Sequence, residues 1–140
     1  MNLFENFGLS QELLVCIKDL GINTPTQIQE LSIPHIISGK DVIGESATGS
    51  GKTLSFGCGI VEHVVSRGGL QALILAPTRE LADQVKESLR KLSKQKNLNV
   101  ISVFGGVSMD PQVEGLRRSE VVVATPGRLL DHLKRRTVDL

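Results

Sequence analysis

Residues 46–53 of this chain read SATGSGKT, a stretch that comes close to the pattern of a phosphate-binding loop. Gly49 and Gly51 allow the backbone to curl so that successive N–H groups point at phosphate oxygens. Lys52 is placed to reach the β and γ phosphates of a nucleotide, and the hydroxyl of Thr53 can bind Mg²⁺. With a strand before it and a helix after it, the stretch predicts a nucleotide-binding turn rather than a glycine-rich turn that binds nothing.

The residues that follow position 40 alternate between short apolar runs and helical patterns. The apolar runs are DVIGE, QALILAP, NVISVFG and EVVVAT, and the helical patterns cover residues 52–66, 78–94 and 109–117 and a last stretch from Pro126 onward. This alternation predicts an α/β fold with a mostly parallel sheet covered by helices. The helix after Lys52 is expected to be irregular because Gly57 and Gly59 are poor helix formers.

Two helices are predicted before this region. Ser10 is a suitable N-cap for QELLVCIKDL, and Gly21 ends that helix. Thr26 caps QIQELSIPHIIS, which ends at Gly39, and Pro34 is expected to kink or shorten this second helix. We therefore divide the chain into N-terminal helices at residues 1–39 and the front part of a nucleotide-binding domain at residues 40–140.

Composition narrows the classes of function. The chain has 140 residues, about one domain, and a net charge of +1, so it has no overall basic field that would attract a nucleic acid. It has four Phe and neither Trp nor Tyr, which argues against a platform that stacks bases. Cys16 and Cys58 lie on apolar helical faces and are expected to be buried free thiols. Without a secretory signal or a membrane-spanning apolar run, we expect a cytoplasmic protein.

Neither the basic side chains at residues 86–96 and 134–136 nor the histidines are assigned a role. Lys86, Arg90 and Lys94 lie opposite the apolar positions of their helix, which is typical of a solvated face. The three histidines have no spacing suited to a metal site.

Four unusual turns each follow a predicted strand: SATGSGKT, APTREL, FGG and ATPGRL. In a parallel sheet these turns lie along the carboxyl edge, where open α/β folds bind ligands. The helix starts after APTREL and ATPGRL offer free N–H groups beside Arg79 and Arg128, and Gly105–Gly106 permits a close backbone approach. Each of the three turns after the phosphate loop reads alone as an ordinary strand-to-helix connection, but the three together, on the edge that also carries the phosphate loop, favour a site for a polyanion.

The segment GINTPTQIQ has two interpretations. Thr26 and Gln29 have the spacing of a capping box, in which Gln29 returns a hydrogen bond to the helix start. A Gln side chain can also donate and accept at once, which suits the N6 and N7 edge of adenine. On spacing alone, the capping box is the better interpretation.

Taken together, PTQIQ, ATGSGKT, PTREL, GG and TPGR occur in an order that closely resembles the DEAD-box family of ATP-dependent RNA helicases. The resemblance runs from about Phe4 to the last residue. It implies a three-layer RecA-like domain, ATP and Mg²⁺ as cofactors, and RNA as the partner. It also implies that Gln29 reads adenine while Phe4 packs against the base.

The resemblance assigns the remaining site residues by motif. Phosphate and Mg²⁺ binding is carried over to Ser46, Ala47, Thr48, Gly49, Ser50, Gly51, Lys52 and Thr53, with Lys52 and Thr53 as the catalytic pair and Thr53 as the metal ligand. Contact with the RNA sugar–phosphate backbone, without sequence readout, is carried over to Pro77, Thr78, Arg79, Glu80, Gly105, Gly106, Thr125, Pro126, Gly127 and Arg128.

The sequence departs from the family pattern in several places. Ser46 stands where Ala is usual, Ile22 where an aromatic is common, and Gly59 where Pro is frequent. No strand here ends in the acidic pair that a P-loop ATPase uses to hold Mg²⁺ and orient water, and a second RecA-like domain is not in the chain. We therefore expect the sheet to be incomplete, the chain to bind nucleotide weakly without hydrolysing it, and unpaired sheet edges to favour self-association.

Two other classes of function remain open on these residues. One is a short non-catalytic module that binds ATP or RNA. The other is a different P-loop NTPase, such as a DNA helicase, which the joint presence of PTQIQ and TPGR disfavours.

Overall fold

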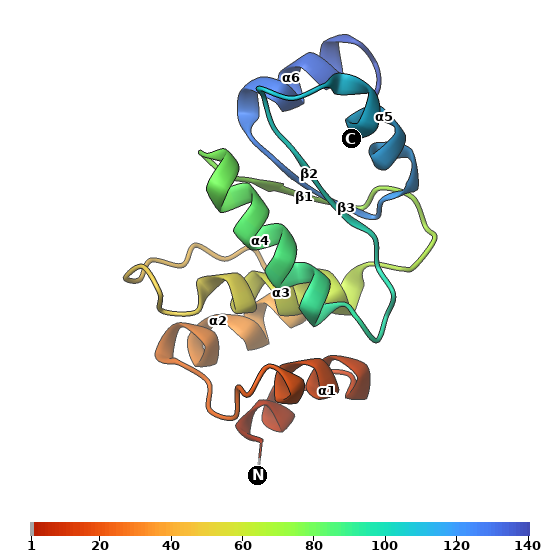
Figure 1. Ribbon diagram of the computed structural model, residues 1–140. Helices are drawn as coiled ribbons and strands as arrows, with labels where there is room; N and C mark the ends of the chain where they lie inside the picture. The colour runs from red at the N-terminus through yellow and green to blue at the C-terminus, as the bar shows by residue number, and fades with distance from the viewer. Residues whose placement is uncertain (1) are drawn as a thin grey trace. The chain divides into compact units, whose positions relative to one another are not determined.

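The computed structural model describes residues 2–140, which form two compact units (Figure 1). The first unit comprises residues up to His63 together with Lys91–Lys96, and the second comprises Val64–Arg90 and Asn97–Leu140. None of the helices among residues 2–140 has the length and apolar character needed to cross a membrane.

The first unit is helical. Its elements are the 3₁₀-helix η1 (Leu3–Phe7) and the α-helices α1 (Gln11–Asp19), α2 (Gln27–Ile37) and α3 (Lys52–His63). They enclose a core of Phe4, Leu9, Leu13, Leu14, Ile17, Ile33, Leu54, Cys58, Val61 and Leu92. The alternation of apolar and polar positions predicted this arrangement, because each helix turns one apolar stripe inward.

The start of α1 is held as its sequence predicts. The Ser10 hydroxyl accepts a hydrogen bond from the backbone N–H of Leu13 at 3.4 Å, which confirms Ser10 as the N-cap. The same hydroxyl donates to Oε1 of Glu62 at 2.7 Å, so α3 also fixes this helix start. Gly21 follows the helix with a φ of 74°, a conformation that glycine adopts without strain.

The second unit contains a parallel three-stranded sheet in the order β1-β3-β2, formed by β1 (Ala72–Leu75), β2 (Val100–Val103) and β3 (Val121–Ala124). Ala72 of β1 and Val100 of β2 both pair with Val121 at the start of the central strand. Every residue of β3 is buried, which explains its unbroken valine run. The α/β class with a mostly parallel, incomplete sheet is thus confirmed.

Helices cover both faces of this sheet. Figure 1 shows α5 (Met109–Arg118) and α6 (Pro126–Lys134) together on one side of the strands, with α4 (Arg79–Leu92) on the other. Val103, Val122 and Ala124 pack with Leu116 of α5 and Leu129 of α6 in the core beneath the first pair. On the other face, the Ser102 hydroxyl donates to Oδ1 of Asp83 in α4 at 2.9 Å.

Three expectations about local structure are corrected. Residues 41–45 form no strand, and Ile43 is fully exposed, because this segment has no neighbouring strand to complete its hydrogen bonds within residues 2–140. Of the two effects expected of Pro34, shortening of the second helix does not occur, since α2 continues through Pro34 to Ile37. Helix α3 is continuous despite Gly57 and Gly59.

The position of Gly59 explains why α3 is regular. A Cβ atom added there would collide with the Ile36 side chain of α2, so the glycine allows the two helices to approach closely. Packing against α2 therefore outweighs the low helix propensity of glycine in α3. The two cysteines are free and buried, as predicted.

Candidate nucleotide and nucleic-acid sites

The predicted phosphate loop lies in the first unit and leads directly into α3. Gly49 and Gly51 have φ values of 79° and 90°, which residues with a side chain rarely adopt. The Ser50 N–H donates to the carbonyl of Ala47 at 3.2 Å and closes a turn inside the loop. Thr53 lies at the second position of α3, close to the positive end of the helix dipole. The loop thus has the backbone form that its glycines predicted.

The start of α2 is bonded to this loop. The Thr26 hydroxyl donates to the carbonyl of Ser50 at 2.7 Å, and Nε2 of Gln29 donates to the carbonyl of Gly51 at 3.1 Å. A Cβ at Gly51 would collide with the Gln29 amide, so this position requires glycine for a second reason. The two segments, more than twenty positions apart in the sequence, therefore form one structural site.

Gln29 also completes the predicted capping box. Its Oε1 accepts a hydrogen bond from the Thr26 N–H at 2.9 Å, and the side chain is almost completely buried. A Gln amide has two donor hydrogens and two acceptor lone pairs, so these two bonds use half of its capacity. Capping the helix and contacting an adenine edge are chemically compatible.

The Lys52 and Ser46 side chains close the loop on itself in this structure. Nζ of Lys52 donates to the carbonyl of Ser46 at 2.5 Å. The Ser46 hydroxyl makes a very short contact with the Ser50 hydroxyl. The serine that departs from the usual pattern therefore contacts the loop directly, which the sequence alone did not indicate.

Phe4, the predicted base-packing aromatic, lies inside the core of the first unit. It has no exposed surface, and its ring meets that of Phe7 edge to face with centroids 5.7 Å apart. Contact between Phe4 and a base therefore requires the neighbouring side chains to move.

A cavity of about 500 Å³ lies beside the loop, a size within the range of small-molecule sites. Within the described part of the chain, the hydroxyl of Ser55 in its wall is buried without a hydrogen-bond partner. The walls are formed by Ile28, Ser32, Ile36, Lys40, Asp41, Val42, Gly44, Lys52, Ser55 and Phe56.

The three other predicted turns lie together at the carboxyl edge of the sheet in the second unit. Pro77–Glu80 follows β1, Gly105–Gly106 follows β2, and Thr125–Arg128 follows β3. All three strands run in the same direction, which confirms their shared edge. The fourth turn, the phosphate loop, belongs to the first unit and follows no strand. The prediction that all four turns follow strands of one sheet is therefore wrong for this loop.

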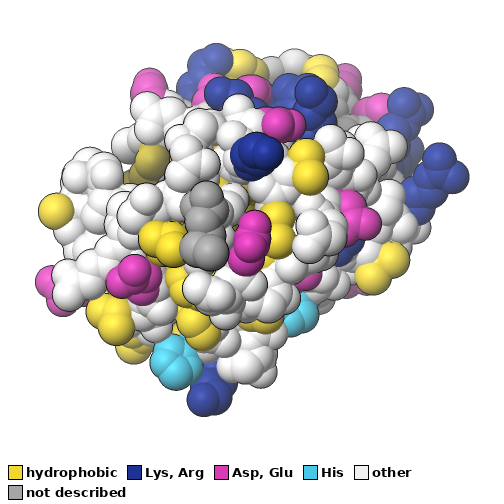
Figure 2. Space-filling view, turned by 90° about the horizontal axis from the view of Figure 1, so that it is seen from below, with side chains coloured by type: hydrophobic (Ala, Val, Ile, Leu, Met, Phe, Trp, Pro, Cys, Tyr) yellow, Lys and Arg dark blue, Asp and Glu magenta, His cyan; other side chains and the backbone are white. Residues whose placement is uncertain are grey.

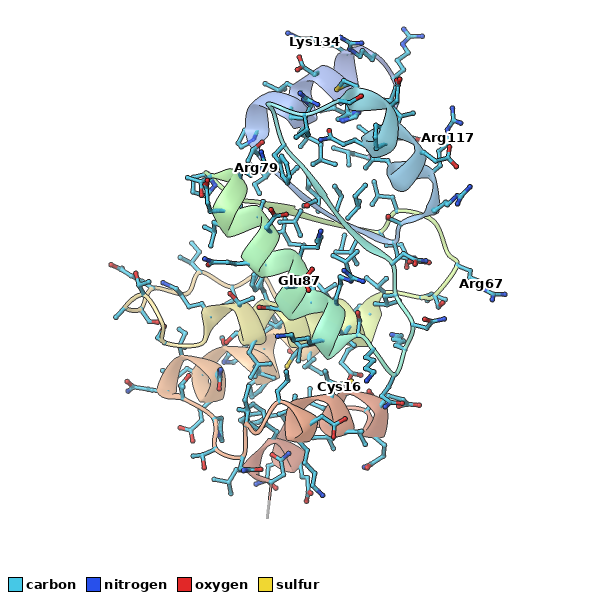
Figure 3. All side chains as sticks on the ribbon, in the orientation of Figure 1. Cys16, Arg67, Arg79, Glu87, Arg117 and Lys134 are labelled. Atoms are coloured by element: carbon cyan, nitrogen blue, oxygen red, sulfur yellow. The ribbon has the colours of Figure 1, made fainter. Side chains whose placement is uncertain are left out.

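Two of these turns are joined by an aromatic contact. The guanidinium of Arg79 lies over the Phe104 ring, 4.5 Å from its centroid. Figure 3 shows Arg79 at the beginning of α4. In the same turn, the Thr78 hydroxyl accepts a hydrogen bond from the Leu81 N–H at 3.2 Å and caps the helix start.

Arg128 is largely buried rather than projecting into solvent. Its side chain is 12% exposed, and Nη1 donates to the carbonyl of Val107 at 3.0 Å and to Oε1 of Gln112 at 3.3 Å. Pro126 and Gly127 of the same motif are exposed, as are Gly105 and Gly106. The exposed surface of these two turns is therefore mainly backbone.

Gln112 contacts two of the predicted turns and His132 contacts Gln112, and neither was given a role in the sequence interpretation. The buried Gln112 amide contacts Arg128, Phe104 and His132. Burial, with Arg128 and Arg135 nearby, lowers the pKa of His132 below its usual value, against the opposing effect of Asp131. The signal available in the sequence was that each of these two polar residues lies on a helix face that is otherwise apolar.

The charged side chains form no metal site among the described residues. Figure 2 shows Lys and Arg side chains mainly in the upper and right-hand part of the view, with Asp and Glu side chains among them. Among residues 2–140, no group of three or more His, Cys, Asp or Glu side chains is arranged to hold a metal ion. The role of the Thr53 hydroxyl as an Mg²⁺ ligand stays a prediction from the sequence.

Comparisons with known proteins agree with these features. The chain is 44% identical over its full length to the ATP-dependent RNA helicase CshA of Listeria monocytogenes, of which it covers 27%. A crystal structure of a DEAD box protein from the hyperthermophile Methanococcus jannaschii matches 98% of the chain, and 38% of that protein, with 40% identity and a TM-score of 0.95.

A hypothetical ATP-dependent RNA helicase from Sulfolobus tokodaii matches 94% of the chain and 38% of its own length, with 34% identity and a TM-score of 0.86. The chain thus spans between about a quarter and two fifths of the length of these relatives. The family model of DEAD/DEAH box helicases matches residues 26–140, from the Thr26 cap through the TPGR turn to the last residue. This chain belongs to the DEAD/DEAH box helicase family.

Proposed function

We propose that this chain is the part of an ATP-dependent RNA helicase that binds ATP and the RNA backbone. The observation that carries the proposal is the bonding of Thr26 and Gln29 to the carbonyls of the phosphate loop. This bonding places an amide able to contact an adenine edge beside a loop shaped for phosphates. The curated relative CshA is itself named an ATP-dependent RNA helicase.

The first unit supplies the proposed nucleotide site. Ser46–Thr53 would hold the phosphates through backbone N–H groups, Lys52 would leave the Ser46 carbonyl to reach them, and Thr53 would bind Mg²⁺. Bound Mg²⁺ supplies charge neutralisation on the phosphates. Phe4 would reach the base only after its neighbours move.

The second unit supplies the proposed RNA site. Its exposed turn backbones at Gly105–Gly106 and Pro126–Gly127 lie at the carboxyl edge of the sheet. N–H groups at such turns can bind phosphates of an RNA strand without reading its sequence. The near-zero net charge fits contact through local geometry rather than through a broad basic surface.

Hydrolysis by the 140-residue chain is not part of the proposal. A P-loop ATPase needs a carboxylate at the end of a strand to orient water and hold the metal, and β1 and β3 lead into Ala76-Pro77 and Thr125-Pro126 instead. RNA unwinding is proposed for the helicase of which these residues form a part. The exposed Ile43 and the edge strand β1, with Leu75 exposed, also favour self-association of the chain.

The proposal is tested by binding Mg-ATP and Mg-GTP to the chain by calorimetry, beside Lys52→Ala. We expect ATP to bind, GTP to bind at least about tenfold more weakly, and Lys52→Ala to lose about tenfold or more in ATP affinity. Equal affinities for ATP and GTP, or ATP binding unaffected by Lys52→Ala, would contradict the proposed site. A DNA helicase is the alternative if a DNA oligonucleotide binds and the matching RNA does not.

A further inference from the structure

Gln112 of α5 is a buried amide that joins three elements of the second unit. The residue is 6% exposed. Its Nε2 donates to the carbonyl of Phe104, the residue that follows β2, at 2.9 Å. Its Oε1 is 2.9 Å from Nε2 of His132 and accepts from Arg128 at 3.3 Å, and both of these residues belong to α6. One side chain therefore links β2, α5 and α6.

The chemistry of the partners fixes the direction of each bond. The Phe104 carbonyl can only accept and the Arg128 guanidinium can only donate, so the Gln112 amide has a single orientation that satisfies both. Because Oε1 then faces the imidazole, Nε2 of His132 must carry a proton. Nδ1 of His132 lies 2.7 Å from the hydroxyl of Thr137, which completes the ring's hydrogen bonds.

The same residues hold both ends of the turn that contains Gly105 and Gly106. Gln112 binds the carbonyl at Phe104, and Arg128 binds the carbonyl at Val107 at 3.0 Å. Between these two attachments, Gly105 and Gly106 are exposed, and a Cβ at either would meet no atom within 4 Å. The glycine backbone is therefore open to a ligand while its flanks are fixed.

We propose that Gln112 and His132 are positioning residues for RNA binding, which hold the Phe104–Val107 turn and the Arg128 guanidinium in place without touching RNA themselves. The inference rests on the proposed RNA-binding function of the second unit. His132 has no exposed surface and Gln112 almost none, and the polar side-chain atoms of both are hydrogen-bonded within the unit, so we assign neither a direct contact with RNA. Arg128, once held by Gln112, is itself a positioning residue. Its side chain is largely enclosed and is bonded to the Val107 carbonyl within the unit.

A fixed turn binds more tightly than a mobile one because less conformational freedom is lost on binding. The effect of Gln112 should therefore be visible in the dynamics of Gly105 and Gly106 before any RNA is added. A role confined to general stability would not produce a change localised to this turn.

Gln71 provides a matched control. Its side chain also ties a turn of the second unit, since Oε1 accepts from the Val65 N–H at 2.9 Å and Nε2 donates to the carbonyls of Val65 and Gly69 at 2.8 and 3.0 Å. It precedes β1, so it lies at the opposite edge of the sheet from Gly105–Gly106. Gln71→Met removes the same kind of bonds without touching the proposed RNA site.

The experiment compares Gln112→Met and Gln71→Met with the unsubstituted chain by NMR relaxation and by binding to a ten-nucleotide oligouridylate. In Gln112→Met we expect the order parameters of Gly105 and Gly106 to fall from about 0.85 to below about 0.6. We expect its affinity for oligouridylate to fall about tenfold, as for the loss of a buried hydrogen-bonding group. Gln71→Met should leave the order parameters of Gly105 and Gly106 at about 0.85 and the oligouridylate affinity within about twofold of the original. Mg-ATP affinity should be unchanged in both variants.

A second variant, Gln112→Glu, keeps the acceptor for Arg128 and His132 but removes the donor to Phe104, so it should fold and still loosen the turn. Order parameters unchanged in both Gln112 variants, or a loosened turn with RNA affinity within about twofold of the original, would overturn the inference. Absence of RNA binding by the unsubstituted chain would contradict the proposed function instead. The order parameters would then still decide whether Gln112 holds the turn.

Discussion

Nε2 of Gln29 donates a hydrogen bond to the carbonyl of Gly51 at 3.1 Å, and this bond joins the first turn of α2 to the phosphate loop. Because Oε1 of the same amide caps the helix through Thr26, the amide has a fixed orientation when a nucleotide arrives. In the proposed nucleotide site, this amide would therefore meet the base with little further ordering cost.

The first prediction concerns Gln29→Ala. We expect Mg-ATP affinity to fall about tenfold and the preference for ATP over GTP to be lost, because the variant removes both the amide and its tie to the loop. Calorimetric titration with each nucleotide checks this. Gln27→Ala, at an exposed position of the same helix start, is the control and should bind both nucleotides as the original chain does.

The second prediction concerns Ser46→Ala. The Ser46 hydroxyl contacts the Ser50 hydroxyl within the closed loop, and Lys52 binds the Ser46 carbonyl. Removing the hydroxyl leaves one bond fewer to break when phosphates enter, so Mg-ATP should bind about two- to fivefold more tightly, corresponding to ~0.5–1 kcal/mol for one hydrogen bond. Weaker binding by Ser46→Ala would show that the serine contacts the nucleotide favourably.

The third prediction is a pH dependence of stability from His132. Its pKa in the folded chain lies below the ordinary value of 6.5, chiefly because of burial. Below pH 6.5 the unfolded chain therefore binds more protons at this residue than the folded chain does, and acidification lowers the free energy of unfolding. The contribution is fully present above about pH 6.5 and is lost as the pH falls toward the folded-state pKa.

Urea unfolding at pH 7.5 and 5.5 measures this effect. His132→Gln should lose less stability between the two pH values than the original chain, whereas His35→Gln, at an exposed position, should lose the same amount as the original. An identical pH dependence in His132→Gln and the original chain would show that His132 does not titrate differently on unfolding.

The fourth prediction concerns Gly59→Ala, in which two effects oppose each other. Alanine favours a helix by about 1 kcal/mol over glycine, but the added methyl collides with Ile36 of α2, and overpacking costs about 1–3 kcal/mol. We expect net destabilisation in thermal unfolding. Ile36→Ala should rescue it, so that the double variant is more stable than the sum of the single effects predicts. Stabilisation by Gly59→Ala alone would argue against close packing of α2 and α3.

The fifth prediction is that Cys58 does not react in the folded chain. Burial, aided by the Glu62 carboxylate, raises the pKa of its thiol to about 12, and the thiolate is the reactive form. Iodoacetamide at pH 8 should label Cys58 only after denaturation, as followed by mass spectrometry. Labelling at the same rate with and without denaturant would contradict the burial of the Cys58 side chain in α3.

Much of this structure was predictable from sequence because local signals and packing agree. The valine run of β3, the cap at Ser10 and the glycines of the phosphate loop each indicated the conformation that formed. Residues 41–45 did not follow their strand pattern, because a strand depends on a neighbour as well as on its own residues.

The contacts of Gln112 and His132 were not predictable for a different reason. These two residues lie twenty positions apart and meet only because α5 and α6 pack on the same face of the sheet. The same holds for the regularity of α3, where Gly59 looks unfavourable until Ile36 is seen beside it. The roles assigned to the site residues themselves remain predictions.

The most direct test of the central claim is to follow the backbone amide signals of the chain by NMR while Mg-ATP is added. We predict shifts concentrated in residues 49–53 and at Gln29, with Mg-GTP producing markedly smaller shifts at Gln29. Shifts confined to the cavity walls around Ile36 and Phe56, or no shifts at millimolar Mg-ATP, would contradict a nucleotide site built from the phosphate loop and the start of α2.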